Sequence, residues 1–142
     1  MTATHVALVQ ASFEQVRPIL ESAALMFYER LFELDPSLRA LFRQSREAQA
    51  QKLAQALTVV VKGLEHPAQL RGAVEALGRR HAGYGVRDEH YTTVGEALIW
   101  TLEQGLGEAF TAEVREAWTA AYGLLATTMQ RGAAQVSLAQ AA

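Results

Sequence analysis

The four histidines, His5, His66, His81 and His90, are the residues of this chain best suited to bind a transition metal. The chain has no cysteine, which excludes thiolate zinc sites, iron–sulfur clusters, disulfides and cysteine nucleophiles. No histidine belongs to a His-Glu-x-x-His motif, and no pair has the spacing of zinc ligands. No serine or threonine lies in a nucleophile elbow, and no glycine-rich phosphate loop follows a predicted strand. The sequence therefore has none of these motifs of hydrolases, kinases or dehydrogenases.

His81 differs from the other three histidines because it continues an apolar stripe. Leu70, Val74, Leu77 and His81 follow one another at steps of 4, 3 and 4, which places the imidazole on the buried face of a helix. The imidazole could be a core group bonded to a carbonyl, or a neutral ligand to a metal in an apolar pocket. A metal there would need to bring its own equatorial ligands, because no other histidine or carboxylate ligand lies nearby. Haem iron does this and needs only one axial histidine.

The elements that must position His81 are predicted to be helices throughout. Apolar residues recur at helical spacing over 6–20, 25–32, 53–64, 70–81, 91–102 and 114–128, and the β-branched run 58–61 falls inside such a pattern. We expect boundaries at Pro18, at Asp35-Pro36, between Gly63 and Pro67, and after the glycines at 83 and 85. Ser45, Asp88 and Thr111 are the expected helix caps. The fold class is therefore all-α, with six or seven helices in one domain over 1–142 and a frayed tail over about 132–142.

The amino-acid composition and net charge limit the kinds of binding partner that we expect. The chain has 142 residues, of which 50% are hydrophobic, and a formal charge of −2. This charge gives no reason to expect nucleic acid or an anionic membrane as a partner. No apolar run approaches the roughly 18 residues of a membrane span. The N-terminus lacks the pattern of a signal peptide, so we expect a cytoplasmic protein.

Three separated blocks resemble the bacterial single-domain haemoglobins, globins related to the haem domain of flavohaemoglobins. The blocks are "FYERLFELDPSLRALF" (27–42), "LGRRHAGYGVRDEHYTTVGEALIWTLEQGLG" (77–107) and "EVREAWTAAYGLL" (113–125). They occur in the family's order and span most of the chain. The resemblance implies a globin fold around a haem pocket, haem b as cofactor, and His81 as the proximal iron ligand.

The same resemblance implies a distal pocket on the other side of the haem. Tyr28 matches the distal tyrosine, and Leu53 matches the leucine above the haem. Gln49 lies beside Leu53 because residues four apart share a helix face, whereas Gln51 is rotated by about 200°. Gln49 is therefore the expected distal amide. Oxygen (alternatively NO or CO) would bind beneath these donors.

The remaining haem contacts are also implied by the resemblance. Phe42 matches the phenylalanine packed on the porphyrin, and Tyr91 matches the tyrosine that supports the proximal histidine. The full set of expected haem contacts is Phe42, Lys52, Leu53, Leu77, Arg80, Val86, Tyr91 and Val94, with Lys52 and Arg80 as candidates for the propionates. The family's last-helix glutamate has no counterpart here, because no carboxylate follows Glu116, and Ala133 and Gln135 fall in the matching region.

Reversible oxygen binding, for storage, delivery or scavenging, is the function that the resemblance favours. Nitric oxide dioxygenase or peroxidase activity with a separate reductase is the alternative. A haem-based sensor ranks lower because 142 residues leave little room for an output domain. The remaining alternative is a helical protein-interaction module that binds no haem. The expected oligomeric state is a monomer or a homodimer.

Overall fold

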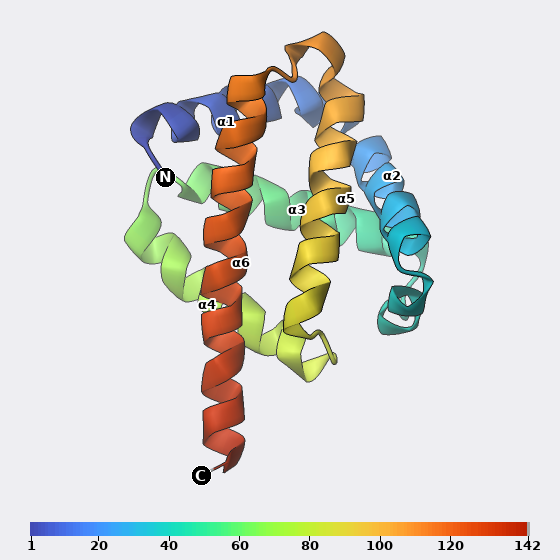
Figure 1. The fold of residues 1–142 in the computed structure, drawn as a ribbon, viewed down its shortest axis with the longest axis vertical. Helices are drawn as coiled ribbons and strands as arrows, with labels where there is room; N and C mark the ends of the chain where they lie inside the picture. The colour runs from blue at the N-terminus through green and yellow to red at the C-terminus, as the bar shows by residue number, and fades with distance from the viewer. Residues whose placement is uncertain (142) are drawn as a thin grey trace.

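The structure is a computed structural model that describes residues 1–141, with side chains through residue 135. Six α-helices and three short 3₁₀ segments follow one another in the described chain (Figure 1): α1 (Ala3–Val16), η1 (Arg17–Ile19), α2 (Leu20–Leu34), η2 (Pro36–Leu41), α3 (Arg46–Gly63), α4 (Pro67–Gly83), α5 (Asp88–Leu106), η3 (Gly107–Ala109) and α6 (Ala112–Ala141). No strand occurs in these residues. The predicted all-α class and helix number are confirmed.

Local chemistry accounts for most helix boundaries. The Ser45 side chain accepts a hydrogen bond from the Ala48 N–H at 3.1 Å and begins α3. Thr111 begins α6 in the same way, its hydroxyl accepting from the Val114 N–H at 3.2 Å. Prolines occupy the first turns of η1, η2 and α4, where a missing N–H costs no helical hydrogen bond. The caps at Ser45 and Thr111 lie where the sequence predicted them.

The predicted cap at Asp88 is wrong by one residue. Arg87 is the N-cap of α5, in an extended conformation with φ −109° and ψ 164°, and Asp88 is the first helical residue. The Arg87 N–H donates to Nδ1 of His90 at 3.0 Å, so a buried imidazole satisfies the start of the helix. Asp88 keeps a favourable place beside the positive end of the helix dipole.

At the other end of the chain, α6 continues to Ala141 where the sequence predicted fraying, and residue 142 lies outside the described residues.

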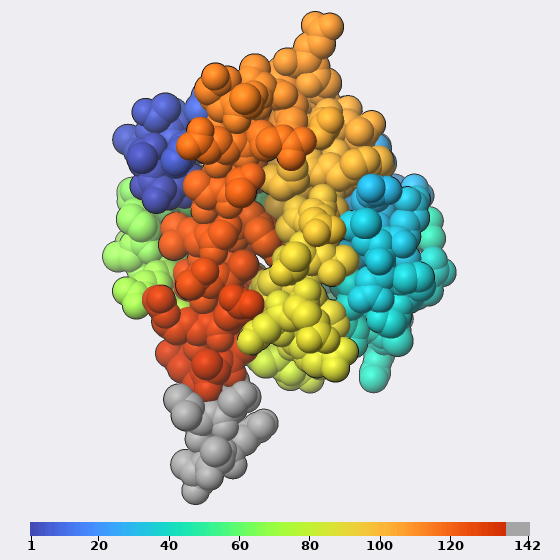
Figure 2. All heavy atoms as spheres, in the orientation of Figure 1, coloured from blue at the N-terminus to red at the C-terminus, as the bar shows by residue number. Residues whose placement is uncertain are grey.

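Two apolar clusters form the core. The larger one lies between α1, α2, α5 and α6 and includes Phe13, Leu31 and Trp118. The Trp118 indole N–H donates to the Ser12 hydroxyl at 2.8 Å, so these two buried polar groups satisfy each other. Figure 2 shows α1, α5 and α6 packed together on one face, with α2 beside α5. The smaller cluster joins α4 to α5 and α6 and includes Tyr91.

Helix α4 crosses α6 at two glycines. A Cβ atom added to Gly78 would collide with the backbone of Met129, and one added to Gly132 would collide with the backbone of Glu75. The two helix backbones can approach this closely only because neither residue has a side chain. This crossing fixes the position of the helix that carries His81. No helix in the described part of the chain is long and apolar enough to cross a membrane.

Candidate functional site

An aromatic group at the junction of α2, η2 and α3 forms one half of the site. The Tyr28 and Phe42 rings meet edge to face at a centroid distance of 5.2 Å, and the Phe32 and Phe42 rings do so at 5.5 Å. Tyr28 is only 6% exposed. Burial raises the pKa of Tyr28 to about 12, so its hydroxyl stays protonated and can donate a hydrogen bond at neutral pH.

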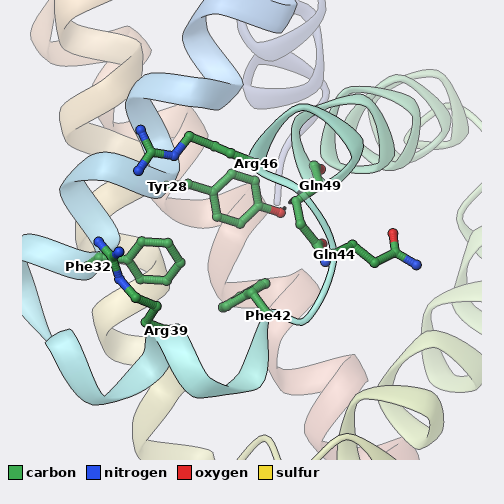
Figure 3. A pocket seen from close by; sticks show the side chains of 7 residues that line it. All are labelled: Tyr28, Phe32, Arg39, Phe42, Gln44, Arg46 and Gln49. Atoms are coloured by element: carbon green, nitrogen blue, oxygen red, sulfur yellow. Dashed lines mark hydrogen bonds between the residues drawn. The ribbon is translucent and has the colours of Figure 1, made fainter.

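The Tyr28 hydroxyl is held weakly by the protein itself. It donates to the backbone carbonyl of Gln49 at 3.4 Å, which is long for an O–H···O bond. Figure 3 shows the Gln49 side chain beside this hydroxyl, and both residues line one cavity. Gln51 is exposed instead. The structure thus places Gln49, and not Gln51, next to Tyr28, as the helix register predicts, and a distal role for Gln49 stays a prediction.

The cavity beside Tyr28 has a volume of about 150 Å³. Its lining residues are Tyr28, Phe32, Arg39, Phe42, Gln44, Arg46 and Gln49 (Figure 3). Sequence reasoning did not single out Arg39 or Arg46. Both are exposed arginines in a segment with little apolar periodicity, and no sequence signal distinguishes them from solvated surface residues.

His81 lies in the last turn of α4 and is half-buried. Its Nδ1 lies 2.9 Å from the Leu77 carbonyl oxygen. A carbonyl can only accept, so Nδ1 carries the proton and the lone pair of the neutral ring is on Nε2. Burial, with a smaller repulsion from Arg80, lowers the pKa of His81 below its usual value, which favours this neutral form.

The residues around His81 come from the turn between α4 and α5. Leu77 and Val86 pack against the smaller cluster beside Tyr91. Gly85 in this turn has φ +91°, a conformation that disfavours side chains. A Cβ at Gly85 would lie 3.6 Å from Cδ2 of Leu41, so the turn after His81 packs against η2, the segment that leads to Phe42. The two halves of the site are therefore in contact at this turn.

The other predicted contacts divide between the two clusters and the surface. Phe42, Leu53 and Val94 pack against the larger cluster. Lys52 and Arg80 are exposed. Tyr91 is 9% exposed, and its backbone carbonyl accepts a hydrogen bond from Tyr122. Haem contact by these six predicted residues, and by Leu77 and Val86, stays a prediction.

Gln135, which falls in the region of the family's last-helix glutamate, lies at the surface. It is exposed, and its side-chain carbonyl accepts a hydrogen bond from Nη1 of Arg79 at 2.9 Å. A carboxylate at position 135 would therefore pair with Arg79 at the surface.

The donor set at His81 fits a metal that arrives with its own ligands. The side chains of the described residues contain no group of three or more His, Cys, Asp or Glu that could hold a metal ion. His5 and His90 accept hydrogen bonds from backbone N–H groups at helix starts. One neutral imidazole beside apolar and aromatic walls suits haem iron, which takes four equatorial nitrogens from its porphyrin.

Comparisons with known proteins agree with this geometry. The family model described as Globin matches residues 25–129. The flavohemoprotein of Bordetella pertussis is 38% identical over 123 residues, covering 84% of this chain and 31% of its own length. The flavohemoprotein of Vibrio cholerae is 35% identical over 133 residues, covering 89% of this chain and 33% of its own length. The chain thus spans about a third of these curated relatives.

Solved structures give the same fold. An engineered carbene transferase, a candidate nitric oxide dioxygenase from Rhodothermus marinus, superposes with a TM-score of 0.90 at 30% identity, covering 100% of this chain and 99% of that one. A hexacoordinated heme protein from an anhydrobiotic tardigrade superposes with a TM-score of 0.84 at 18% identity, over 94% of this chain and 95% of that one, and supports the fold alone.

Proposed function

Because the chain belongs to the globin family, we propose that it binds haem b through His81 and binds oxygen reversibly beneath Tyr28, Gln49 and Leu53. The observation that carries this proposal is the state of His81. Its Nδ1 is committed to the Leu77 carbonyl, so its Nε2 presents a lone pair, and its lowered pKa keeps the ring neutral. Storage, delivery and scavenging of oxygen are the roles this chemistry allows.

When bound, haem would supply the iron to which a diatomic gas binds. The protein contributes the fifth ligand and orients it. The Leu77 carbonyl fixes the tautomer and rotation of the His81 ring and increases the basicity of Nε2. Leu77 and Val86 pack on this side, and the exposed Lys52 and Arg80 are the cations available to the propionates.

On the opposite side the protein supplies hydrogen-bond donors and excludes water. The protonated Tyr28 hydroxyl can leave its long bond to the Gln49 carbonyl and donate to an oxygen atom that carries partial negative charge. The Gln49 amide can donate to the same atom. Oxygen accepts such bonds better than carbon monoxide does, so these donors favour oxygen. Phe42 lines the cavity, and Leu53 packs with it against the larger cluster; this apolar surface would exclude water and so slow oxidation.

Absorption spectroscopy of the purified protein tests this function. The ferric protein is measured first, and then the reduced protein is measured with and without oxygen. We expect a Soret band in each state and a spectrum that returns to the deoxy form when oxygen is removed. A protein that takes up no haem after reconstitution would exclude the proposal.

Nitric oxide dioxygenation with a separate reductase is the second candidate. The curated relatives are flavohemoproteins, and the Rhodothermus marinus structure carries the description of a candidate nitric oxide dioxygenase. The oxygenated protein should then consume NO in a single turnover, and sustained consumption should require an added flavin reductase and NADH. A single turnover no faster than that of free haem would remove this candidate.

A further inference from the structure

The cavity beside Tyr28 is lined by hydrogen-bond donors and by no acidic side chain. Its lining residues Arg39, Arg46, Gln44, Gln49 and Tyr28 all carry hydrogen-bond donors. In Figure 3 the Tyr28 hydroxyl is turned toward Gln49, on the side of the ring away from the two guanidinium groups. Figure 3 shows the two guanidinium groups reaching the same side, next to the rings of Phe32 and Tyr28. Such a lining is complementary to a small anion.

The two arginines are held in different ways. The Arg39 guanidinium lies over the Phe32 ring at 5.2 Å from the centroid. This stacking restricts the position of the guanidinium without engaging its N–H groups as hydrogen-bond donors. The Arg46 Nη1 lies 3.4 Å from Oε1 of Glu29, in a pair whose side chains are 46% and 57% exposed. An exposed pair of this kind is weak, so an anion can compete with Glu29 for Arg46.

The cavity has the size for a small molecule. Its volume of about 150 Å³ equals that of an engineered protein cavity that accepts benzene, at ~150 Å³. A planar ion with one negative charge and several oxygen atoms is smaller than benzene. The flat fork of a guanidinium pairs with two oxygens of such an ion at once, which a spherical halide cannot match.

We propose that this cavity is a subsite for small planar oxyanions, of which nitrate and nitrite are the test cases. The subsite lies between Arg39 and Arg46, on the outer side of Tyr28 and Phe32. It is formed by side chains of this chain alone, and so it does not rest on the proposed gas ligand. Nitrate is also the product of the second candidate function, and Tyr28 and Gln49 border both the cavity and the proposed gas site.

Isothermal titration calorimetry of the purified, haem-reconstituted protein with sodium nitrate and sodium nitrite tests the proposal. The sample is reduced and saturated with carbon monoxide, so that nitrite cannot bind to iron, and ionic strength is held constant with sodium chloride. We expect saturable binding with a millimolar Kd. Arg39→Gln and Arg46→Gln should each weaken it about fivefold, the value for a charged hydrogen bond reduced for solvent exposure.

Three further variants separate this site from general attraction to positive charge. Arg43 is exposed, lies between the two arginines in sequence and does not line the cavity, so Arg43→Gln should change Kd by less than about twofold. Glu29→Gln should tighten binding by removing the competitor of Arg46. Arg46→Lys keeps the charge but loses the fork, and should bind nitrate more weakly than the unchanged protein does.

The outcomes are distinct from those of the proposed function. Absence of saturable heat, or equal weakening by Arg39→Gln and Arg43→Gln, would overturn the subsite. Oxygen binding is measured on the same protein before carbon monoxide is added, and a chain that takes up no haem is titrated with the anions as purified. Normal oxygen binding without anion binding removes the subsite alone, whereas anion binding in a chain that takes up no haem removes the globin function alone and leaves the subsite standing.

Discussion

Replacement of Tyr28 by phenylalanine isolates one hydroxyl group in the proposed gas pocket. The ring is 6% exposed and packs edge to face on Phe42, and phenylalanine preserves both features. The hydroxyl makes one hydrogen bond to the protein, to the Gln49 carbonyl at 3.4 Å. Loss of such a long bond should lower the free energy of unfolding by no more than about 1 kcal/mol.

The effect on bound oxygen should be much larger. A hydrogen bond to a charged or strongly polarised group contributes about 1.5–3 kcal/mol, which corresponds to roughly a 10- to 100-fold faster oxygen off-rate. The pKa of about 12 keeps Tyr28 a donor throughout the neutral range, so the effect should not depend on pH between about 6 and 9.

The assay is stopped-flow displacement of oxygen by carbon monoxide, with urea denaturation of the same variants as a measure of stability. Tyr84→Phe is the matched control, because it removes the same hydroxyl from a side chain that is 64% exposed and near His81. An off-rate in Tyr28→Phe within about twofold of the unchanged protein would refute the distal role of this hydroxyl. A large loss of stability would refute our reading of its bond to Gln49.

Three other predictions follow from the same geometry. His81→Gly should lose stable haem binding, and free imidazole should restore the absorption spectrum; an unchanged ferrous spectrum would contradict the ligand assignment. Gln49→Leu should raise the oxygen off-rate non-additively with Tyr28→Phe, while Gln51→Leu should change the off-rate little. A larger effect of Gln51→Leu than of Gln49→Leu would mean that the predicted register of this helix is wrong. Gly78→Ala should lower the free energy of unfolding by about 2–3 kcal/mol because its Cβ meets the α6 backbone, whereas Gly72→Ala, which meets nothing within 4 Å, should raise it by about 0.5–1 kcal/mol in urea denaturation.

Much of the fold could be predicted because it depends on local geometry. Helical periodicity identified the helices, including the β-branched run 58–61 that lies inside α3. The caps at Ser45 and Thr111 depend on residues only three positions away. The same local rule separated Gln49 from Gln51, since residues four apart share a helix face whatever the tertiary structure is. The predicted cap of α5 was wrong by one residue, because the His90 imidazole accepts a hydrogen bond from the Arg87 N–H.

The sequence by itself thus determined the helices, the face on which His81 lies and the family to which the motifs point. The tertiary structure decided what those faces meet. It brought Gly78 against Met129, turned Gln135 toward Arg79, and placed Arg39 and Arg46 around one cavity beside Tyr28. These contacts join residues from different segments, and they depend on how helices and turns cross in space. A periodic pattern fixes the rotation of a residue about its own helix, but the partner across an interface is set only when the whole core packs.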